Sequence, residues 1–124
     1  MGKRILVIED QEDNRRILRD LLTSVGYEII EATTGEEGVA SAETGHPDLI
    51  LMDIQLPGID GYEATRRVRA YPTLQQVPII AVTSYALSGD DVKAKEAGCT
   101  DYVPKPFSPR ALLAKIRQYL PQAG

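Results

Sequence analysis

The feature that most constrains the fold of this chain is an unbroken apolar run, residues 49–52, that stops at Asp53 and a turn containing Pro57 and Gly58. A strand that is apolar at every position is buried on both faces, which is typical of a parallel sheet covered by helices. The run therefore predicts a central strand with Asp53 at its carboxyl end. Taken alone, Asp53 is equally well explained as an acid that caps the following turn.

Length and composition narrow the class of protein. The 124 residues suffice for one domain with a moderate core, and we expect that domain to span residues 1–124. A formal net charge of −4 and a pI near 5.0 argue against direct binding to nucleic acid, because phosphate binding needs a basic face. The single cysteine, Cys99, excludes an internal disulfide and a cysteine metal cluster, and a free thiol suits a reducing compartment.

Apolar runs and the start of the chain bear on location. No apolar run approaches the ~20 residues that cross a membrane, so we expect no membrane association. Residues 4–8 already read as a strand, without a preceding signal peptide. We therefore expect a cytoplasmic protein.

The chain alternates short strands with helices. Apolar runs predict strands at residues 4–8, 27–32, 49–53, 77–82 and 101–103. Helical spacing and capping residues predict helices that end before Gly26, run from Thr34 to about Gly45, run from Gly61 toward Pro72, run from about Leu87 to Ala97, and follow Ser108. Five strands alternating with five helices predict an α/β fold, a doubly wound parallel sheet with helices on both faces.

Charged and hydroxyl side chains end four of the predicted strands. Glu9 and Asp10 follow the first strand, and Asp53 ends the third. Thr83 follows the fourth strand, and Lys105 follows the fifth. Because the carboxyl ends of parallel strands meet at one edge of a sheet, we expect these side chains to converge. The alternative is a cluster of purely structural ion pairs.

The chemistry of this set indicates a metal-assisted phosphoryl site. Three carboxylates at close quarters cannot all stay ionised without a cation, because like charges raise one another's pKa. Ligands that are all oxygen favour a hard ion, Mg²⁺ before Mn²⁺ or Ca²⁺. Thr83 and Lys105 suit the phosphoryl oxygens, which leaves Asp53 as a nucleophile that forms an aspartyl-phosphate.

Four segments resemble the receiver domains of two-component response regulators, the CheY-like superfamily. They are residues 5–10 (ILVIED), 51–61 (LMDIQLPGIDG), 78–83 (PIIAVT) and 102–106 (YVPKP). The resemblance covers nearly the whole chain and implies a flavodoxin-like sheet of strand order 2-1-3-4-5. Asn14, residues 54–57 and Cys99 are also similar to single-domain regulators of the DivK type and to receivers of hybrid kinases.

The resemblance implies a metal site and a phosphorylated residue. Asp53 matches the phosphorylated aspartate, and Asp10 matches a Mg²⁺-binding acid. Glu9, where many receivers have Asp, matches a second acid that binds mostly through water. The backbone carbonyl of Gln55 is the further metal ligand that the resemblance implies.

The resemblance also implies a switch. Thr83 matches the hydroxyl that is drawn to the phosphoryl group, and Tyr102 matches the aromatic that turns inward behind it. Lys105 matches the phosphoryl-binding lysine, and the bond from Lys105 to Pro106 is expected to be cis. The resemblance further implies that Gln55 and Tyr85 flank the approach of the hydrolytic water, and the bulk of Tyr85 then predicts a long-lived aspartyl-phosphate.

The resemblance to receiver domains also implies which proteins interact with this chain. The phosphoryl donor is expected to be a phosphohistidine on a histidine kinase or a histidine phosphotransfer protein. Output is expected through protein contacts of the face made by the predicted helix at about residues 87–97, the strand at residues 101–103 and the helix that follows Ser108. The chain is expected to be a monomer or a weak dimer. No enzymatic activity is expected beyond its own phosphorylation and dephosphorylation.

Three other classes of protein fit these residues less well. A phosphatase of the haloacid-dehalogenase type needs a second Asp two residues after the nucleophile, where this chain has Gln55. A flavin-binding domain needs a phosphate-cradling loop after its first strand, where this chain has the acids Glu9 and Asp10. A receiver that only docks partners is disfavoured, because the set of acids, hydroxyl and lysine is complete.

Four further side chains are expected to have structural roles. His46 precedes a proline and is expected to be a surface turn residue rather than a phosphoryl relay. Tyr71, Tyr85 and Tyr119 are better explained by packing or partial burial than as exposed contact points for a partner.

Overall fold

The computed structural model describes residues 2–83 and 90–120 and contains five strands and five helices in this part of the chain. The strands are β1 (Arg4–Ile8), β2 (Glu28–Ala32), β3 (Leu49–Asp53), β4 (Ile79–Thr83) and β5 (Asp101–Pro104). The helices are α1 (Glu12–Ser24), α2 (Gly35–Gly45), α3 (Gly61–Arg69), α4 (Asp90–Ala97) and α5 (Pro109–Tyr119), with a 3₁₀ turn, η1 (Pro72–Leu74).

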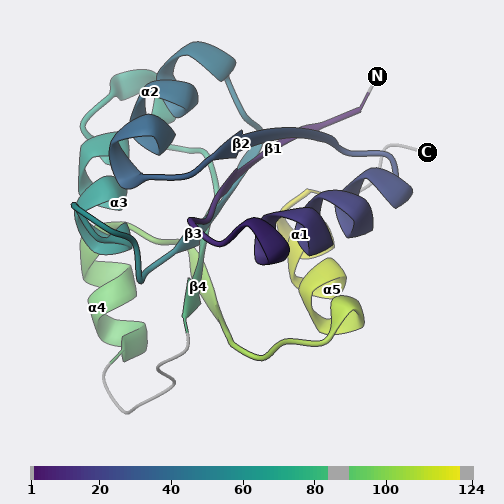
Figure 1. Cartoon of the computed structure of the whole chain (residues 1–124). Coiled ribbons are helices and arrows are strands. Elements are labelled where there is room, and N and C mark those ends of the chain that lie inside the picture. The colour runs from purple at the N-terminus through teal and green to yellow at the C-terminus, as the bar shows by residue number, and fades with distance from the viewer. Residues whose placement is uncertain (1, 84–89, 121–124) are drawn as a thin grey trace.

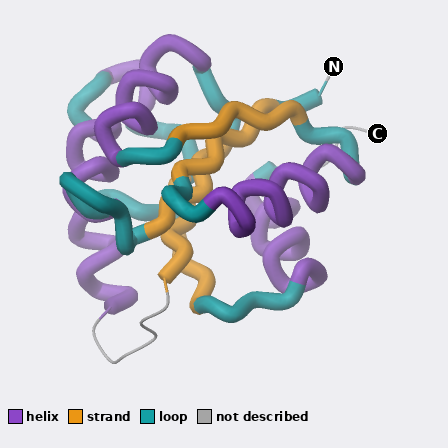
Figure 2. The backbone as a smooth tube through the Cα atoms, viewed as in Figure 1, coloured by secondary structure: helices purple, strands orange, loops and turns teal. Residues whose placement is uncertain are grey.

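The five strands form one parallel sheet in the order β2-β1-β3-β4-β5, which confirms the predicted fold class. Helices α1 and α5 cover one face of the sheet, and α2, α3 and α4 cover the other (Figures 1 and 2). The order reverses between β1 and β3, and the carboxyl ends of β1, β3, β4 and β5 follow one another along one edge.

The core has two layers, one on each face of the sheet, and β3 contributes to both. Ile50 and Met52 pack in the layer beneath α2, α3 and α4, whereas Leu49 and Leu51 pack in the layer beneath α1 and α5. All four side chains are at most 1% exposed, and burying each contributes about 2 kcal/mol. Burial on both faces is why β3 is apolar at successive positions rather than at alternate ones.

Polar caps begin three helices where the sequence places them. The side chains of Thr34, Asp60 and Ser108 accept hydrogen bonds from main-chain N–H groups in the first turns of α2, α3 and α5. Gly98 ends α4 with a φ of 112°, a left-handed conformation that favours glycine. These local signals therefore set the points at which the chain enters and leaves the sheet.

Several details differ from the sequence-based expectations. The strand β2 begins at Glu28, one residue later than predicted. The strand β4 begins at Ile79, because Pro78 has no N–H to donate to a ladder. The η1 turn that starts at Pro72 was not predicted. Ile17 recurs with Leu18, Leu21 and Leu22 at helical spacing, which predicts burial on the apolar face of α1, but the structure leaves it 56% exposed. The predicted start of α4 at Leu87 lies outside the described residues.

The side chains expected to have structural roles agree with that expectation where they are described. His46 is exposed and left-handed (φ 47°) directly after α2. Tyr71 and Tyr119 are partly buried against the two core layers. Burial raises the pKa of the Cys99 thiol, which contacts Thr65. Within the described residues, no helix is long and apolar enough to cross a membrane.

Candidate functional site

Three carboxylates meet at the carboxyl edge of the sheet. Carboxylate oxygens of Glu9, Asp10 and Asp53 lie within 4.8 Å of one another. Glu9 and Asp53 are buried, and Asp10 is partly exposed. The structure thus brings together the acids that follow β1 and end β3, as the sequence predicted.

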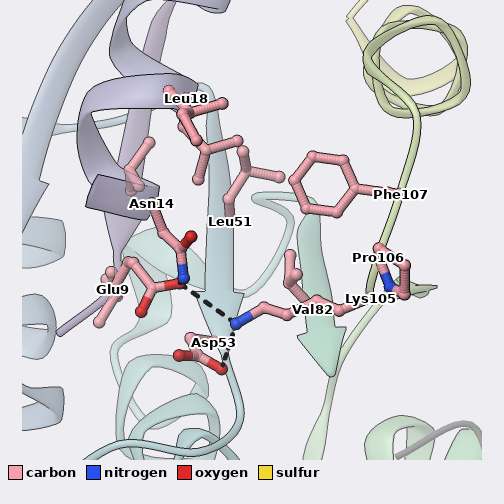
Figure 3. Close-up of a pocket in the computed structure, with 12 residues that line it drawn as sticks. Glu9, Asn14, Leu18, Leu51, Asp53, Val82, Lys105, Pro106 and Phe107 are labelled. Carbon is pink, nitrogen blue, oxygen red and sulfur yellow. Dashed lines mark hydrogen bonds and ion pairs between the residues drawn. The ribbon is translucent and has the colours of Figure 1, made fainter. Parts of the chain in front are cut away.

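Lys105, from the loop after β5, points into this group of acids (Figure 3). Its Nζ lies 3.2 Å from Oε1 of Glu9 and 3.4 Å from Oδ1 of Asp53. Glu9 and Lys105 are 96 positions apart in the sequence, so only the sheet makes them neighbours. The peptide bond from Lys105 to Pro106 is cis, as the resemblance implied.

One ammonium does not balance three carboxylates. With all groups ionised the cluster carries −3 + 1 = −2 formal charges, and two of the carboxylates are buried. Burying like charges together is costly unless a cation joins them. The donors are all oxygen atoms, which suits Mg²⁺, so the residues present fit that ion.

Hydrogen bonds aim the buried carboxylates. Oε2 of Glu9 accepts from the N–H of Gln11 at 3.1 Å, and its Oε1 accepts from Nδ2 of Asn14 at 3.4 Å. Oδ1 of Asp53 accepts from the N–H of Gln55 at 3.1 Å, which closes a turn just after β3. The side chain of Gln55 is exposed. Each buried acid is therefore held by the loop that follows its own strand.

The start of α3 packs directly against the end of β3. The N–H of Gly61 donates to the carbonyl of Ile54 at 2.9 Å. A Cβ at position 61 would lie 2.7 Å from Cα of Ile54 and would collide with the carbonyl oxygen of Asp53. Gly61 is therefore required for this close approach, because the obstacles are main-chain atoms that cannot turn aside.

Thr83 and Tyr102 lie on adjacent strands near the same edge. Thr83 is buried at the end of β4, and its carbonyl accepts from the N–H of Lys105 at 2.7 Å. Tyr102 pairs with Ala81 of β4, is partly exposed, and packs against the core layer beneath α2, α3 and α4. Tyr85, which is expected to affect the lifetime of the aspartyl-phosphate, lies outside the described residues.

The structure shows two features that sequence reasoning missed. Arg15 donates through Nη1 to the main-chain carbonyls of Glu9, at 3.0 Å, and Asp10, at 3.1 Å. A cavity of about 530 Å³ adjoins the acids, and apolar side chains including those of Leu18 and Phe107 line much of it (Figure 3). Ile17 also lines this cavity, but no sequence signal marks it, because its exposure shows only in the folded chain.

Fold and site together define a CheY-like α/β protein whose acids, hydroxyl and lysine gather at the carboxyl edge of the sheet. The family described as "Response regulator receiver domain" matches residues 5–117. The chain therefore belongs to the receiver domains of two-component response regulators.

Relatives of known sequence and structure agree with this family. The polar-differentiation response regulator DivK of Brucella ovis is 41% identical over 123 residues, which are 99% of this chain and 100% of that protein. The receiver domain of a sensor histidine kinase from Pseudomonas aeruginosa, with a magnesium ion coordinated in its active site cleft, is 39% identical. It superposes with a TM-score of 0.91, covering 98% of this chain and 100% of that one.

A second solved structure shows the same fold at lower identity. The chemotaxis protein CheY4 of Vibrio cholerae is 27% identical and superposes with a TM-score of 0.92, covering 96% of this chain and 99% of that one. The CheY-like fold is thus shared with relatives that retain only about a quarter of the same residues.

Proposed function

We propose that Asp53 accepts a phosphoryl group from a phosphohistidine of a partner protein and that the chain then signals through a change of conformation. The observation that carries the proposal is the ion pair between buried Asp53 and Lys105, set beside Glu9 and Asp10. A nucleophile, a cation for phosphoryl oxygens and an acid pair for a metal lie in one site.

The geometry of Asp53 suggests which oxygen attacks. The N–H of Gln55 and the ammonium of Lys105 both contact Oδ1, so we assign the attack on phosphorus to Oδ2. The new bond joins Oδ2 to phosphorus while the bond from phosphorus to the donor imidazole breaks. The ammonium of Lys105 would then bind the phosphoryl oxygens instead of Asp53. The negative charge of these oxygens compensates for the ion pair with Asp53 that is lost.

Glu9, Asp10, Asp53 and the backbone carbonyl of Gln55 are the residues that would hold Mg²⁺. When bound, the ion supplies positive charge that stabilises the phosphoryl oxygens. Asn14 and the N–H of Gln11 keep Glu9 oriented toward that site.

The switch in this proposal uses Thr83 and Tyr102. A phosphoryl group on Asp53 adds charge and acceptor oxygens, which favour an inward Thr83 hydroxyl and vacate space for Tyr102. The signal then reaches the surface made by α4, β5 and α5, where a downstream protein would bind. Support comes from the position of Thr83 at the end of β4, one strand from Tyr102.

The proposed partners are a histidine kinase or a histidine phosphotransfer protein and a downstream protein target. We propose that residues 1–124 act as one receiver domain in the cytoplasm, as a monomer or weak dimer. No reaction on another substrate is part of the proposal: the chain catalyses only its own phosphorylation and dephosphorylation.

The variant Asp53→Asn tests the proposal. Incubation with Mg²⁺ and a small phosphodonor such as acetyl phosphate should add one phosphoryl group to the wild type, measured by intact mass. Asp53→Asn should remain unlabelled, because an amide oxygen is a poor nucleophile.

Asp60→Asn is the matched control, with the same chemical change seven residues further on. Asp60 is an exposed N-cap of α3, and Asn caps a helix as well as Asp does. This variant should be labelled like the wild type. Equal labelling of Asp53→Asn and the wild type would exclude Asp53 as the acceptor, and an unlabelled wild type would favour a receiver that only docks partners.

A further inference from the structure

A row of three charged side chains connects the edge strand β2 to the loop that carries the acid pair. Arg15 lies in α1, and its side chain is 15% exposed. Its Nη1 binds the carbonyls of Glu9 and Asp10, the two residues that follow β1. One guanidinium nitrogen therefore fixes two successive peptide groups of residues 9–11, the loop between β1 and α1 that we call the acid loop.

The other end of Arg15 is held by β2. Its Nε lies 3.6 Å from Oε1 of Glu31. Arg19, one turn further along α1, donates to both carboxylate oxygens of Glu31, from Nε to Oε2 at 2.8 Å and from Nη2 to Oε1 at 2.9 Å. The hydrogen bond from Arg19 lowers the pKa of Glu31, so this carboxylate stays ionised.

The acid loop needs such support because the sheet ends just before it. The N–H of Glu9 donates to the carbonyl of Ala32 at 3.0 Å, the last bond of β1 with β2. After this bond, the hydrogen bonds described for the main-chain carbonyls of Glu9 and Asp10 are the two that Arg15 donates. Side-chain directions follow the main chain, so fixing these carbonyls fixes where the two carboxylates can reach.

We propose that Arg15, held in place by Glu31 and Arg19, is a positioning residue that sets the affinity of the Glu9 and Asp10 pair for Mg²⁺. This inference rests on the proposed function, since it assigns these acids to the metal. The positive charge of Arg15 repels Mg²⁺, but the carboxylate of Glu31, whose Oε1 lies 3.6 Å from Nε of Arg15, offsets that charge. Preorganisation of the loop is therefore the larger effect, because a loose loop must be ordered when the ion binds.

Arg15→Met tests this directly, because Met keeps the length of the side chain but neither its charge nor its donors. The measurement is a Mg²⁺ titration at constant ionic strength, followed by the NMR shift of the Gln11 amide, which donates to Glu9. The dissociation constant should rise about fivefold or more, as expected for the loss of two charge-assisted hydrogen bonds. Arg15→Lys keeps the charge but cannot contact both carbonyls and Glu31 at once. Its Mg²⁺ dissociation constant should therefore lie between those of the wild type and Arg15→Met.

Arg16→Met is the matched control. Arg16 is the next residue of α1, is 63% exposed, and pairs only with the exposed Asp13 at 3.5 Å among the contacts described. It loses the same charge without touching the loop, so its Mg²⁺ affinity should match that of the wild type within about twofold, as for an exposed pair.

Two further readouts separate positioning from general destabilisation. Glu31→Gln should weaken Mg²⁺ binding in the wild type but much less in Arg15→Met, because Glu31 acts through Arg15. Excess Mg²⁺ should restore phosphorylation of Arg15→Met to the wild-type rate, which a damaged fold would not allow.

Mg²⁺ affinity of Arg15→Met equal to or tighter than that of Arg16→Met would overturn the inference. If Arg15→Met does not fold, the same comparison is made with Arg15→Lys. A wild type that binds no Mg²⁺ would instead contradict the proposed function, so the two failures are distinguishable.

Discussion

Asp101, at the start of β5, is a single carboxylate that ties a helix to the sheet. Its Oδ2 accepts from the Tyr119 hydroxyl at 2.7 Å and lies 3.1 Å from Nζ of Lys115, both on α5. Its Oδ1 accepts from the N–H of Tyr102 at 2.8 Å. Burial raises the pKa of Asp101, but these three donors together outweigh burial and leave the pKa below its usual value.

Removing the Tyr119 hydroxyl should weaken this connection. Tyr119→Phe keeps the ring but loses one hydrogen bond to a carboxylate, so the free energy of unfolding at pH 7 should fall by about 1 kcal/mol. A group whose pKa is lowered by folding stabilises the protein above its unfolded pKa, near 4, and loses that contribution as the pH falls through its folded pKa. The difference between the two proteins should therefore shrink toward pH 3.

Urea unfolding at pH 7 and at lower pH measures this difference. Tyr71→Phe, a partly buried tyrosine in the other core layer, is the control for loss of a hydroxyl. A difference between Tyr119→Phe and the wild type that is the same at pH 7 and pH 3 would show that the Asp101 charge is not involved.

At the scale of elements, the junction of β3 and α3 positions Asp53, the proposed phosphoryl acceptor. Gly61 begins α3 and lies against the main chain of Asp53 and Ile54. Neither neighbour can move without shifting the end of β3, on which Asp53 stands. Helix α3 and Asp53 are thus coupled through a contact that requires glycine.

Gly61→Ala should therefore lower the free energy of unfolding by about 2 kcal/mol, because its Cβ overlaps main-chain atoms. Urea unfolding monitored by circular dichroism gives the value. The rate of phosphorylation by a small phosphodonor should also fall as Asp53 is displaced.

Gly45→Ala is the matched control in the last residue of α2. There the Cβ would meet only the tip of the Ile30 side chain, which can rotate away, and alanine favours a helix by about 1 kcal/mol. This variant should be neutral or slightly stabilised. Equal stability of the Gly61→Ala variant and the wild type would show that the junction is loose.

At the scale of the whole molecule, packing is unequal across the sheet. Strands β3 and β4 are buried at every position. Helix α4 buries Ala94 and Ala97, two small side chains, and exposes Val92. A helix that buries little apolar surface has low local stability, so α4 is the element best suited to move in a switch.

Binding of beryllofluoride, a phosphoryl mimic, should therefore change amide hydrogen exchange unevenly. We expect altered protection in α4, β5 and α5, and little change in β1 and β3, whose side chains form the centre of both core layers. Exchange followed by mass spectrometry with and without the mimic measures this pattern. Asp53→Asn is the control and should show no change, and identical protection of residues 90–117 in both states would contradict a switch at that face.

The sequence by itself determined the fold class and the core of the site. Local periodicity reports burial, so the apolar run before Asp53 was enough to predict a doubly covered parallel strand. Once the strands are parallel, their carboxyl ends must share an edge, which is why Glu9, Asp53 and Lys105 were predicted to meet.

For polar groups outside the set predicted at the strand ends, only the tertiary structure decided which distant ones bind one another. The bonds from Arg15 to the acid loop and from Tyr119 to Asp101 leave no periodic signal, because each depends on where two separate elements pack. The exposure of Ile17 has the same origin, since helical spacing shows that a face is apolar but not how far a neighbour covers it. The local pattern of apolar residues predicts which positions are buried, whereas directional contacts between elements exist only after the chain has folded.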